Sequence, residues 1–203
     1  MLFSVGVVVE GHGEMEAVPL LIRRVVQQID PLLDVHIPHP VRFSRSTLLR
    51  AGGLEKAVIF AAENAGRDGA VLVVLDSDDD CPARLGPALL DRARAARADL
   101  PIAVVLAKCE YENWFLAAAE SLRGRRGLPD DIESPADPEA IRGAKEWLSD
   151  RMLSDNYVPT LHQAAFTASF DLVAAQRADS FSKCWRGIVG MVTEIRRRHN
   201  PAG

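Results

Sequence analysis

Two largely apolar segments, each running directly into acidic residues, most constrain the fold of this 203-residue chain. Residues 70–75 read Ala-Val-Leu-Val-Val-Leu and continue into Asp-Ser-Asp-Asp-Asp, and residues 3–9 continue into Glu-Gly-His-Gly-Glu. Apolar runs of this length without polar alternation are typical of parallel strands that are buried on both faces. Because parallel strands need crossover connections, which are usually helical, we expect an α/β domain.

The segments between the predicted strands have helical spacing. Apolar residues recur three or four positions apart over residues 15–29, 54–65 and 85–96, and Pro82 favours the first turn of the third helix. Short extended pieces at 35–37 and 41–43, separated by prolines, fit an edge strand. We therefore expect a Rossmann-like, mainly parallel sheet of about four strands, flanked by helices.

The second half of the chain is expected to be helical. Asp137 and Pro138 predict the start of a helix that runs to residue 152, and Thr160 with Gln163 predicts a capping box for a helix toward residue 176. Ser180 predicts the N-cap of a last helix. We expect residues 1–109 to form the α/β core and residues 110–203 to form a helical extension packed on it, not an independent domain.

Composition limits the partners and the compartment. The net charge is −4, so binding of nucleic acid would need a local basic patch. Three cysteines without a CxxC pair argue against a disulfide framework or a zinc site and fit a reducing compartment. No basic leader precedes the first strand, and no apolar stretch approaches the ~18 residues that cross a bilayer, so we expect a cytoplasmic protein without membrane contact.

The acidic strand ends predict a divalent-metal site. Ligands bind beyond the carboxyl ends of such strands, and Glu10 and Asp76 would lie roughly 5 to 10 Å apart if their strands are neighbours. In an extended segment Asp76 and Asp78 point the same way, and Asp80 is a further candidate ligand. Carboxylates this close repel unless a cation separates them, and hard oxygen ligands suit Mg²⁺ or Mn²⁺. The alternative is that the aspartates only cap the next helix and that Glu14 only favours a helix dipole.

Further charged residues extend this hypothesis. Glu110 and Glu112 follow the last predicted strand, where they are either ligands of a second metal, partners that orient the first ligands, or a solvated helical turn. Lys145, Lys183 and Arg186 are candidate contacts to nucleic-acid phosphates, although basic residues commonly just solvate a surface.

Several of these segments together resemble a known family. A strand ending in Glu10-Gly, followed two β-α units later by a strand ending in Asp76-x-Asp78, resembles the toprim fold of topoisomerases, primases and OLD-family nucleases. With the Glu-Tyr-Glu-Asn-Trp-Phe-Leu-Ala segment at 110–117 and the Ser-Phe pair at 180–181, the chain is similar to a bacterial family of stand-alone toprim-like proteins. Members of that family are often encoded beside ATPases implicated in phage defence.

The resemblance implies a toprim-like fold and roles for four acids. Glu10, Asp76 and Asp78 match the metal-binding acids of the toprim pattern, and Glu14 matches the second acid of the OLD-type pattern. No tyrosine is positioned as a topoisomerase nucleophile would be, which argues against that activity.

Three functions remain open from the sequence. The favoured one is a Mg²⁺- or Mn²⁺-dependent nuclease on nucleic acid, acting in phage defence with a partner ATPase, in which Glu10 or Glu14 assists proton transfer. The second is a HAD-like phosphatase with Asp76 as the nucleophile. The third is a non-catalytic toprim-like subunit of an ATPase complex. The oligomeric state is left open, a dimer included.

Overall fold

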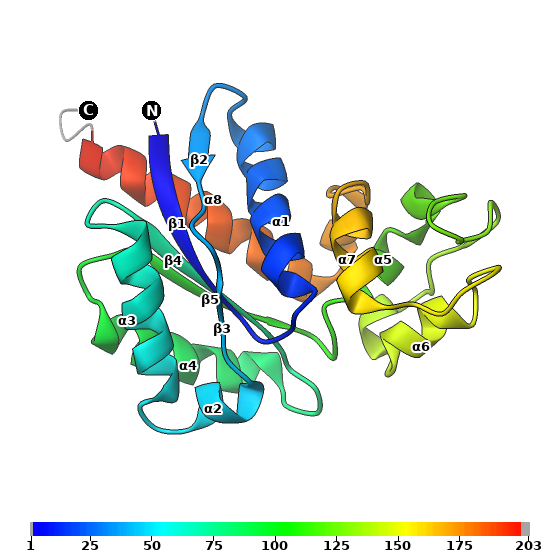
Figure 1. Cartoon of the computed structure of the whole chain (residues 1–203), viewed down its shortest axis with the longest axis horizontal. Coiled ribbons are helices and arrows are strands. Elements are labelled where there is room, and N and C mark those ends of the chain that lie inside the picture. Colours follow the sequence, from blue (N-terminus) through cyan, green and yellow to red (C-terminus); the bar gives the residue numbers. More distant parts are fainter. Residues whose placement is uncertain (1, 200–203) are drawn as a thin grey trace.

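The computed structural model describes residues 2–199, and a parallel sheet between two layers of helices forms its centre (Figure 1). The strand order is β2-β1-β4-β5, every pairing is parallel, and a short β3 pairs with the far end of β1. The strands are β1 (Leu2–Val9), β2 (Asp34–His36), β3 (Val41–Arg42), β4 (Ala70–Asp76) and β5 (Ile102–Ala107). The α/β class with a parallel sheet is therefore confirmed.

The expected edge strand exists in two pieces. β2 pairs with the start of β1 and β3 pairs with its end, so the two short strands occupy one edge of the sheet. Pro38 and Pro40 lie between them, where each lacks the N–H that a continuous ladder would need.

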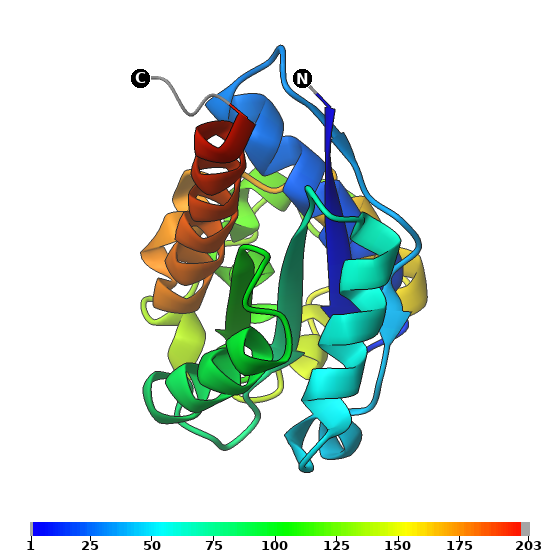
Figure 2. The same cartoon turned by 90° about the vertical axis from the view of Figure 1, so that its left-hand side faces the viewer.

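Helices cover both faces of the sheet (Figure 2). Side chains alternate along β4 between two apolar clusters, one shared with α1 and α8 and the other shared with α2, α3 and α4. Gly6 in β1 allows α3 to pack closely, because a Cβ at this position would lie 2.1 Å from the carbonyl oxygen of Ala61. These helices are α1 (Glu14–Ile29), α2 (Arg45–Leu49), α3 (Gly53–Ala65), α4 (Pro82–Ala96) and α8 (Asp179–His199).

The second half of the chain consists of short helices, followed by α8, which packs on β5. Its buried aromatic side chains, among them Trp114, Phe115 and Phe181, belong to the same apolar cluster as β1 and β4. The remaining elements are α5 (Asn113–Ala117), η1 (Ala119–Leu122), η2 (Pro138–Ala140), α6 (Ala144–Ser149), α7 (Pro159–Thr167) and η3 (Ala174–Arg177). None of the helices within residues 2–199 is long and apolar enough to cross a membrane.

The predicted helix starts in this half were partly wrong. Asp137 does accept a bond from the N–H of Ala140, but it caps only the short η2. A left-handed Gly143, with φ of 71°, separates η2 from α6. The Thr160 capping box is wrong because Val158 occupies the N-cap of α7, without a side-chain cap.

The start of α8 is capped by a distant residue. The carboxylate of Glu139 accepts the N–H groups of Asp179 and Ser180, at 3.1 and 2.9 Å. The hydroxyl of Ser180, which the sequence assigned to the cap, instead accepts the indole N–H of Trp114 and the N–H of Lys108. Ser180 therefore ties α8 to the loop after β5.

Candidate acidic site at the carboxyl edge of the sheet

The site lies where the direction of strand addition reverses. From β1 the chain adds β2 on one side and later β4 and β5 on the other, and β1 and β4 are direct neighbours with Val8 opposite Val73. Glu10 directly follows β1, and Asp76 is the last residue of β4. The condition set in the sequence analysis, that these two strands are neighbours, is therefore met, and such a reversal point is the usual ligand crevice of an open α/β sheet.

Glu14 closes the loop after β1. Its Oε2 atom accepts the backbone N–H groups of Glu10 and Gly11, both at 3.1 Å, while only 4% of the residue is exposed. Burial raises the pKa of Glu14 to about 7, against these two hydrogen bonds, and the nearby carboxylates of Glu112 and Glu10 raise it further. Glu14 is thus a carboxyl group that holds its proton to a higher pH than an ordinary glutamic acid does.

The close packing of this loop depends on Gly13. A Cβ at Gly13 would lie 2.2 Å from Oε1 of Gln163 and 2.8 Å from the carbonyl oxygen of Pro159. The first turn of α1 can therefore rest against the start of α7 only because this residue has no side chain.

Asp76 is fixed by the loop that follows β5. Its Oδ1 atom accepts the N–H of Tyr111 at 2.7 Å, and its Oδ2 atom lies 3.9 Å from Nζ of Lys145. Burial raises the pKa of Asp76 well above its ordinary value, and the carboxylates of Glu14 and Glu112 raise it further while Lys145 opposes them.

Glu112 is a fully buried acid with polar or charged neighbours at both of its oxygens. Its Oε1 atom accepts the hydroxyl of Tyr157 at 3.0 Å and the amide of Gln163 at 3.3 Å, and its Oε2 atom lies 3.2 Å from Nζ of Lys145. Burial raises the pKa of Glu112, with Lys145 opposing it. The sequence-based alternative of a solvated helical turn is wrong for Glu112.

Lys145 is the cation of this cluster. Its Nζ donates to Oε1 of Glu110 at 2.9 Å, and its backbone N–H donates to Oε2 of the same residue at 3.2 Å. Burial would lower the pKa of Lys145, but Glu112, Asp76 and Glu110 together raise it above its ordinary value. Lys145, a candidate phosphate contact from the sequence, is held by carboxylates and is charged at neutral pH.

Negative groups outnumber the positive ones that face them. Glu10, Glu14, Asp76 and Glu112 influence one another electrostatically, and burial raises the pKa of Glu10 as well. Within the described part of the chain, Oε2 of Glu10 is buried without a hydrogen-bond partner, as is Oε2 of Glu112, which has only its ion pair with Lys145. Such a cluster either retains protons at neutral pH or attracts a cation.

The aspartates after β4 do not continue the strand, so the extended geometry expected for them is wrong. β4 ends at Asp76, and Asp78 has a positive φ of 49°. Asp78 and Asp80 both reach back to Arg45: Oδ2 of Asp78 lies 3.3 Å from its Nε, and Asp80 accepts a bond from its Nη2. Arg45 also donates to the carbonyl oxygens of Asp76 and Ser77, each at 3.2 Å.

The acidic side chains at this edge of the sheet are the candidate ligands of the predicted divalent metal. Among the acids, histidines and cysteines of residues 2–199, no group of three or more is already arranged to hold a metal ion. The donor set is nevertheless all carboxylate, and the unpartnered Oε2 of Glu10 is the kind of hard oxygen that Mg²⁺ or Mn²⁺ prefers. Glu10 and Asp76 are therefore the candidate ligands, and Asp78 could join them only if its ion pair with Arg45 opens.

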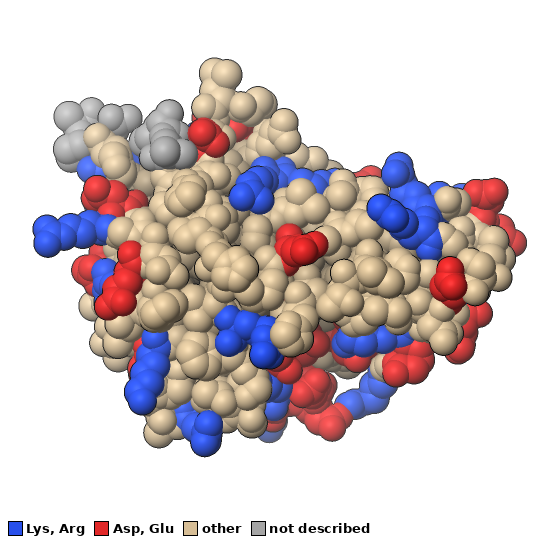
Figure 3. Space-filling model, viewed as in Figure 1, with Lys and Arg blue, Asp and Glu red and all other residues tan. Residues whose placement is uncertain are grey.

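Acidic and basic atoms intermingle along the lower edge of the molecule, toward which β1 runs in Figure 1 (Figure 3).

Sequence reasoning missed Arg45, Tyr157 and Gln163 as residues of the site, because no local motif marks them. Lys183 and Arg186 do not join the site; both lie on α8 beside a groove that α8 forms with α4.

The fold and the site define a three-layer α/β protein with a buried acidic cluster at the reversal point of its sheet. A model of the family described as "Domain of unknown function (DUF4276)" matches residues 9–188, and the chain belongs to this family. Neither the curated proteins nor the solved structures contain a match.

Proposed function

We propose that this protein is a divalent-metal-dependent phosphodiesterase that cleaves nucleic acid, with a toprim-like acidic site. One observation carries the proposal: at the ligand crevice of the sheet, Asp76 lies among the carboxyl groups of Glu10, Glu14 and Glu112, whose charges repel its own, and an oxygen of Glu10 has no partner within residues 2–199. A divalent cation would relieve that repulsion. The likeness of Glu10 and the Asp76-x-Asp78 pattern to toprim acids supports the same assignment.

Each residue has a role in this proposal. Glu10 and Asp76 would hold the ion, with Asp78 as a further ligand. A bound Mg²⁺ or Mn²⁺ would supply polarisation of a phosphoryl oxygen and a water of lowered pKa. Glu14 is able to accept or return a proton near neutral pH, because its pKa is about 7.

One cation of the site, Arg45, suits a phosphodiester backbone, and a second, Lys145, balances the acids. Arg45 is anchored to the carbonyl oxygens of Asp76 and Ser77, so its guanidinium is positioned beside the acidic cluster. If Asp78 turns from Arg45 to the ion, that guanidinium is free to pair with a phosphate oxygen. Lys145 keeps Asp76 and Glu112 from repelling one another.

The test is cleavage of circular single-stranded DNA, plasmid and RNA in the presence of Mg²⁺ or Mn²⁺. Asp76→Asn and Glu10→Gln are expected to lower the cleavage rate by at least about 100-fold. Replacing a residue that only hydrogen-bonds a metal ligand already lowers activity by up to about that factor. Glu16→Gln, an exposed acid in the same turn as Glu14, is the matched control and should keep full activity. Cleavage by both site variants at the wild-type rate would refute the proposed site.

One observation favours a second candidate, a non-catalytic toprim-like subunit. Arg45 and Lys145 already neutralise part of the cluster, through ion pairs with Asp78, Glu110 and Glu112. In this case the protein would act only within a complex, such as one with a partner ATPase in phage defence. Absence of cleavage by the protein alone, with cleavage appearing only in a reconstituted complex, would distinguish this candidate.

A further inference from the structure

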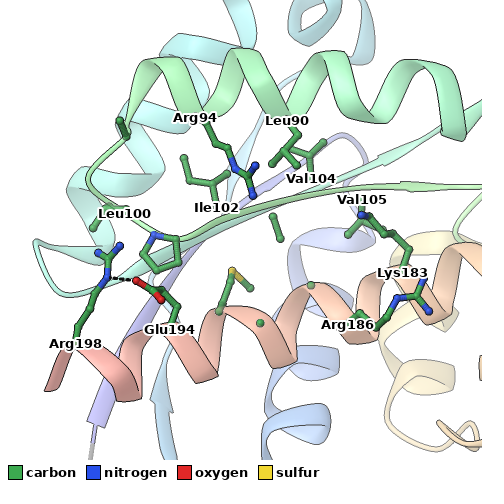
Figure 4. Close-up of a pocket in the computed structure, with 16 residues that line it drawn as sticks. Leu90, Arg94, Leu100, Ile102, Val104, Val105, Lys183, Arg186, Glu194 and Arg198 are labelled. Carbon is green, nitrogen blue, oxygen red and sulfur yellow. Dashed lines mark hydrogen bonds and ion pairs between the residues drawn. The ribbon is translucent and has the colours of Figure 1, made fainter. Parts of the chain in front are cut away.

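A long groove follows the outer edge of the sheet. Between α4 and α8, a hollow of about 600 Å³ and an adjoining one of about 490 Å³ share Leu90, Val104 and Lys183 as lining residues. Together they extend along the whole of β5, from Leu100 just before it to Lys108 just after it. Figure 4 shows the hollow of larger volume, with α4 above, α8 below and β5 between them.

The backbone of β5 at this groove is free to accept another strand. The N–H of Val71 bonds the carbonyl oxygen of Pro101 and that of Ser77 bonds Ala107, so the odd-numbered residues of β5 face β4. The even-numbered residues Ile102, Val104 and Leu106 therefore direct their N–H and C=O groups into the groove. Within residues 2–199, no strand pairs with this edge and no side chain bonds these three backbones.

Three glycines, which have no side chain, line the groove. They are Gly86 of α4 and Gly187 and Gly190 of α8, and Gly187 lets α8 pack close to β5, since a Cβ there would lie 3.2 Å from Cβ of Ala103. A Cβ at Gly190 would meet no atom within 4 Å, and one at Gly86 would meet only the tip of Leu106 at 3.5 Å. The two helices thus leave open space over the strand edge.

The rim of the groove is basic. Arg94 of α4 and Lys183 and Arg186 of α8 line it, and among the described residues no carboxylate lies within ion-pair distance of any of the three. The lining acids are largely engaged: Glu194 is paired with Arg198, and Glu139 holds the start of α8. A ligand of this groove should accordingly be negatively charged.

We propose that β5 binds an extended acidic peptide segment of a partner protein, which adds to the sheet as a further strand. Main-chain bonds to Val104 and its even-numbered neighbours would give affinity, while the basic rim would select acidic side chains. A second copy of this chain is disfavoured, because pairing two β5 edges would bring like-charged arginines together. A nucleic-acid backbone would not pair with the N–H and C=O groups that β5 directs into the groove. It would also leave unused the apolar floor that Leu90 and Val104 provide.

The inference is independent of phosphodiester cleavage, because the groove contains none of the carboxylates of the acidic site. The probe is a fluorescein-labelled, end-capped peptide of about eight residues, long enough to span a strand, with alternating Glu and Val. Saturable binding by fluorescence anisotropy is expected, with hydrogen-exchange protection of the Val104 and Leu106 amides. The same peptide N-methylated at every bond keeps its charge but cannot pair as a strand, and should not bind.

Protein variants test the rim. Lys183→Glu combined with Arg186→Glu is expected to weaken binding by at least about tenfold, whereas the same charge change at the exposed Arg23 and Arg67 should have no effect. Equal binding of the N-methylated peptide, or no binding of the Glu-Val peptide, would overturn the proposal. An oligothymidylate that binds tighter than the peptide, and is lost in the Lys183/Arg186 variant, would assign the groove to nucleic acid instead.

Discussion

Replacing Glu14 with glutamine should change how the stability of the protein depends on pH. The pKa of Glu14 is raised from 4.5 to about 7, chiefly by burial, so the folded state holds this proton more tightly than the unfolded state does. The resulting loss of stability is absent below about pH 4.5 and complete above about pH 7. The glutamine side chain of the variant would keep an oxygen for the N–H groups of Glu10 and Gly11 but would have no charge to bury.

The magnitude follows from the two pKa values. One pKa unit corresponds to about 1.36 kcal/mol. Linkage therefore predicts that Glu14 lowers the free energy of unfolding of the wild type by about 2.5 kcal/mol between pH 5 and pH 8. The carboxylate of Glu14 also repels that of Asp76. Removing the charge of Glu14 ends this repulsion, which further stabilises the variant relative to the wild type at high pH. The variant should therefore gain stability over the wild type as the pH rises.

Urea unfolding at pH 5 and pH 8 in the presence of a chelator measures this difference. The free energy of unfolding of Glu14→Gln, relative to wild type, should rise by about 2.5 kcal/mol between the two pH values. Glu16→Gln, which removes an exposed acid from the same helical turn, should show no such rise. Parallel pH profiles for wild type and Glu14→Gln would refute the electrostatic reasoning.

Three further outcomes are expected. At pH 8, Mg²⁺ or Mn²⁺ at about 100 times its dissociation constant should stabilise the wild type by about 2.7 kcal/mol, measured by urea unfolding, and should leave Asp76→Asn unchanged. Lys145→Met should cost about 2 kcal/mol, because Asp76 and Glu112 lose their cation, and adding Glu112→Gln should restore part of it; equal stability of Lys145→Met and wild type would contradict the ion-pair account. Gly6→Ala should cost about 1 to 3 kcal/mol by chemical denaturation, because its Cβ would overlap the carbonyl of Ala61; an unchanged midpoint would show that α3 does not pack as described.

The sequence predicted the sheet because its signals are local. The apolar runs that become β1 and β4, and the acids at their ends, mark strands and their carboxyl edge without reference to the rest of the chain. That both acids lie at one edge of the sheet followed from the general behaviour of parallel sheets, whereas the direct pairing of β1 with β4 was only a condition of the prediction and comes from the structure.

The remainder of the site depends on contacts that no local pattern encodes. Lys145 reaches Glu110 and Glu112 from α6, and Tyr157 reaches Glu112 from the segment before α7. Asp78 was placed incorrectly because a strand signal does not reveal that the chain turns left-handed immediately afterwards. The boundaries of α6 and α7 failed for a similar reason, since tertiary packing, and not capping residues, sets the ends of such short helices.

The position of a divalent cation tests the central claim most directly. Crystals of the protein soaked in Mn²⁺ and measured for anomalous scattering should give a peak bonded to the carboxylates of Glu10 and Asp76, with Asp78 turned away from Arg45. That peak should disappear in Asp76→Asn. A map without a peak at this edge of the sheet, with Oε2 of Glu10 unchanged and the Arg45–Asp78 pair intact at saturating Mn²⁺, would contradict a metal-dependent function.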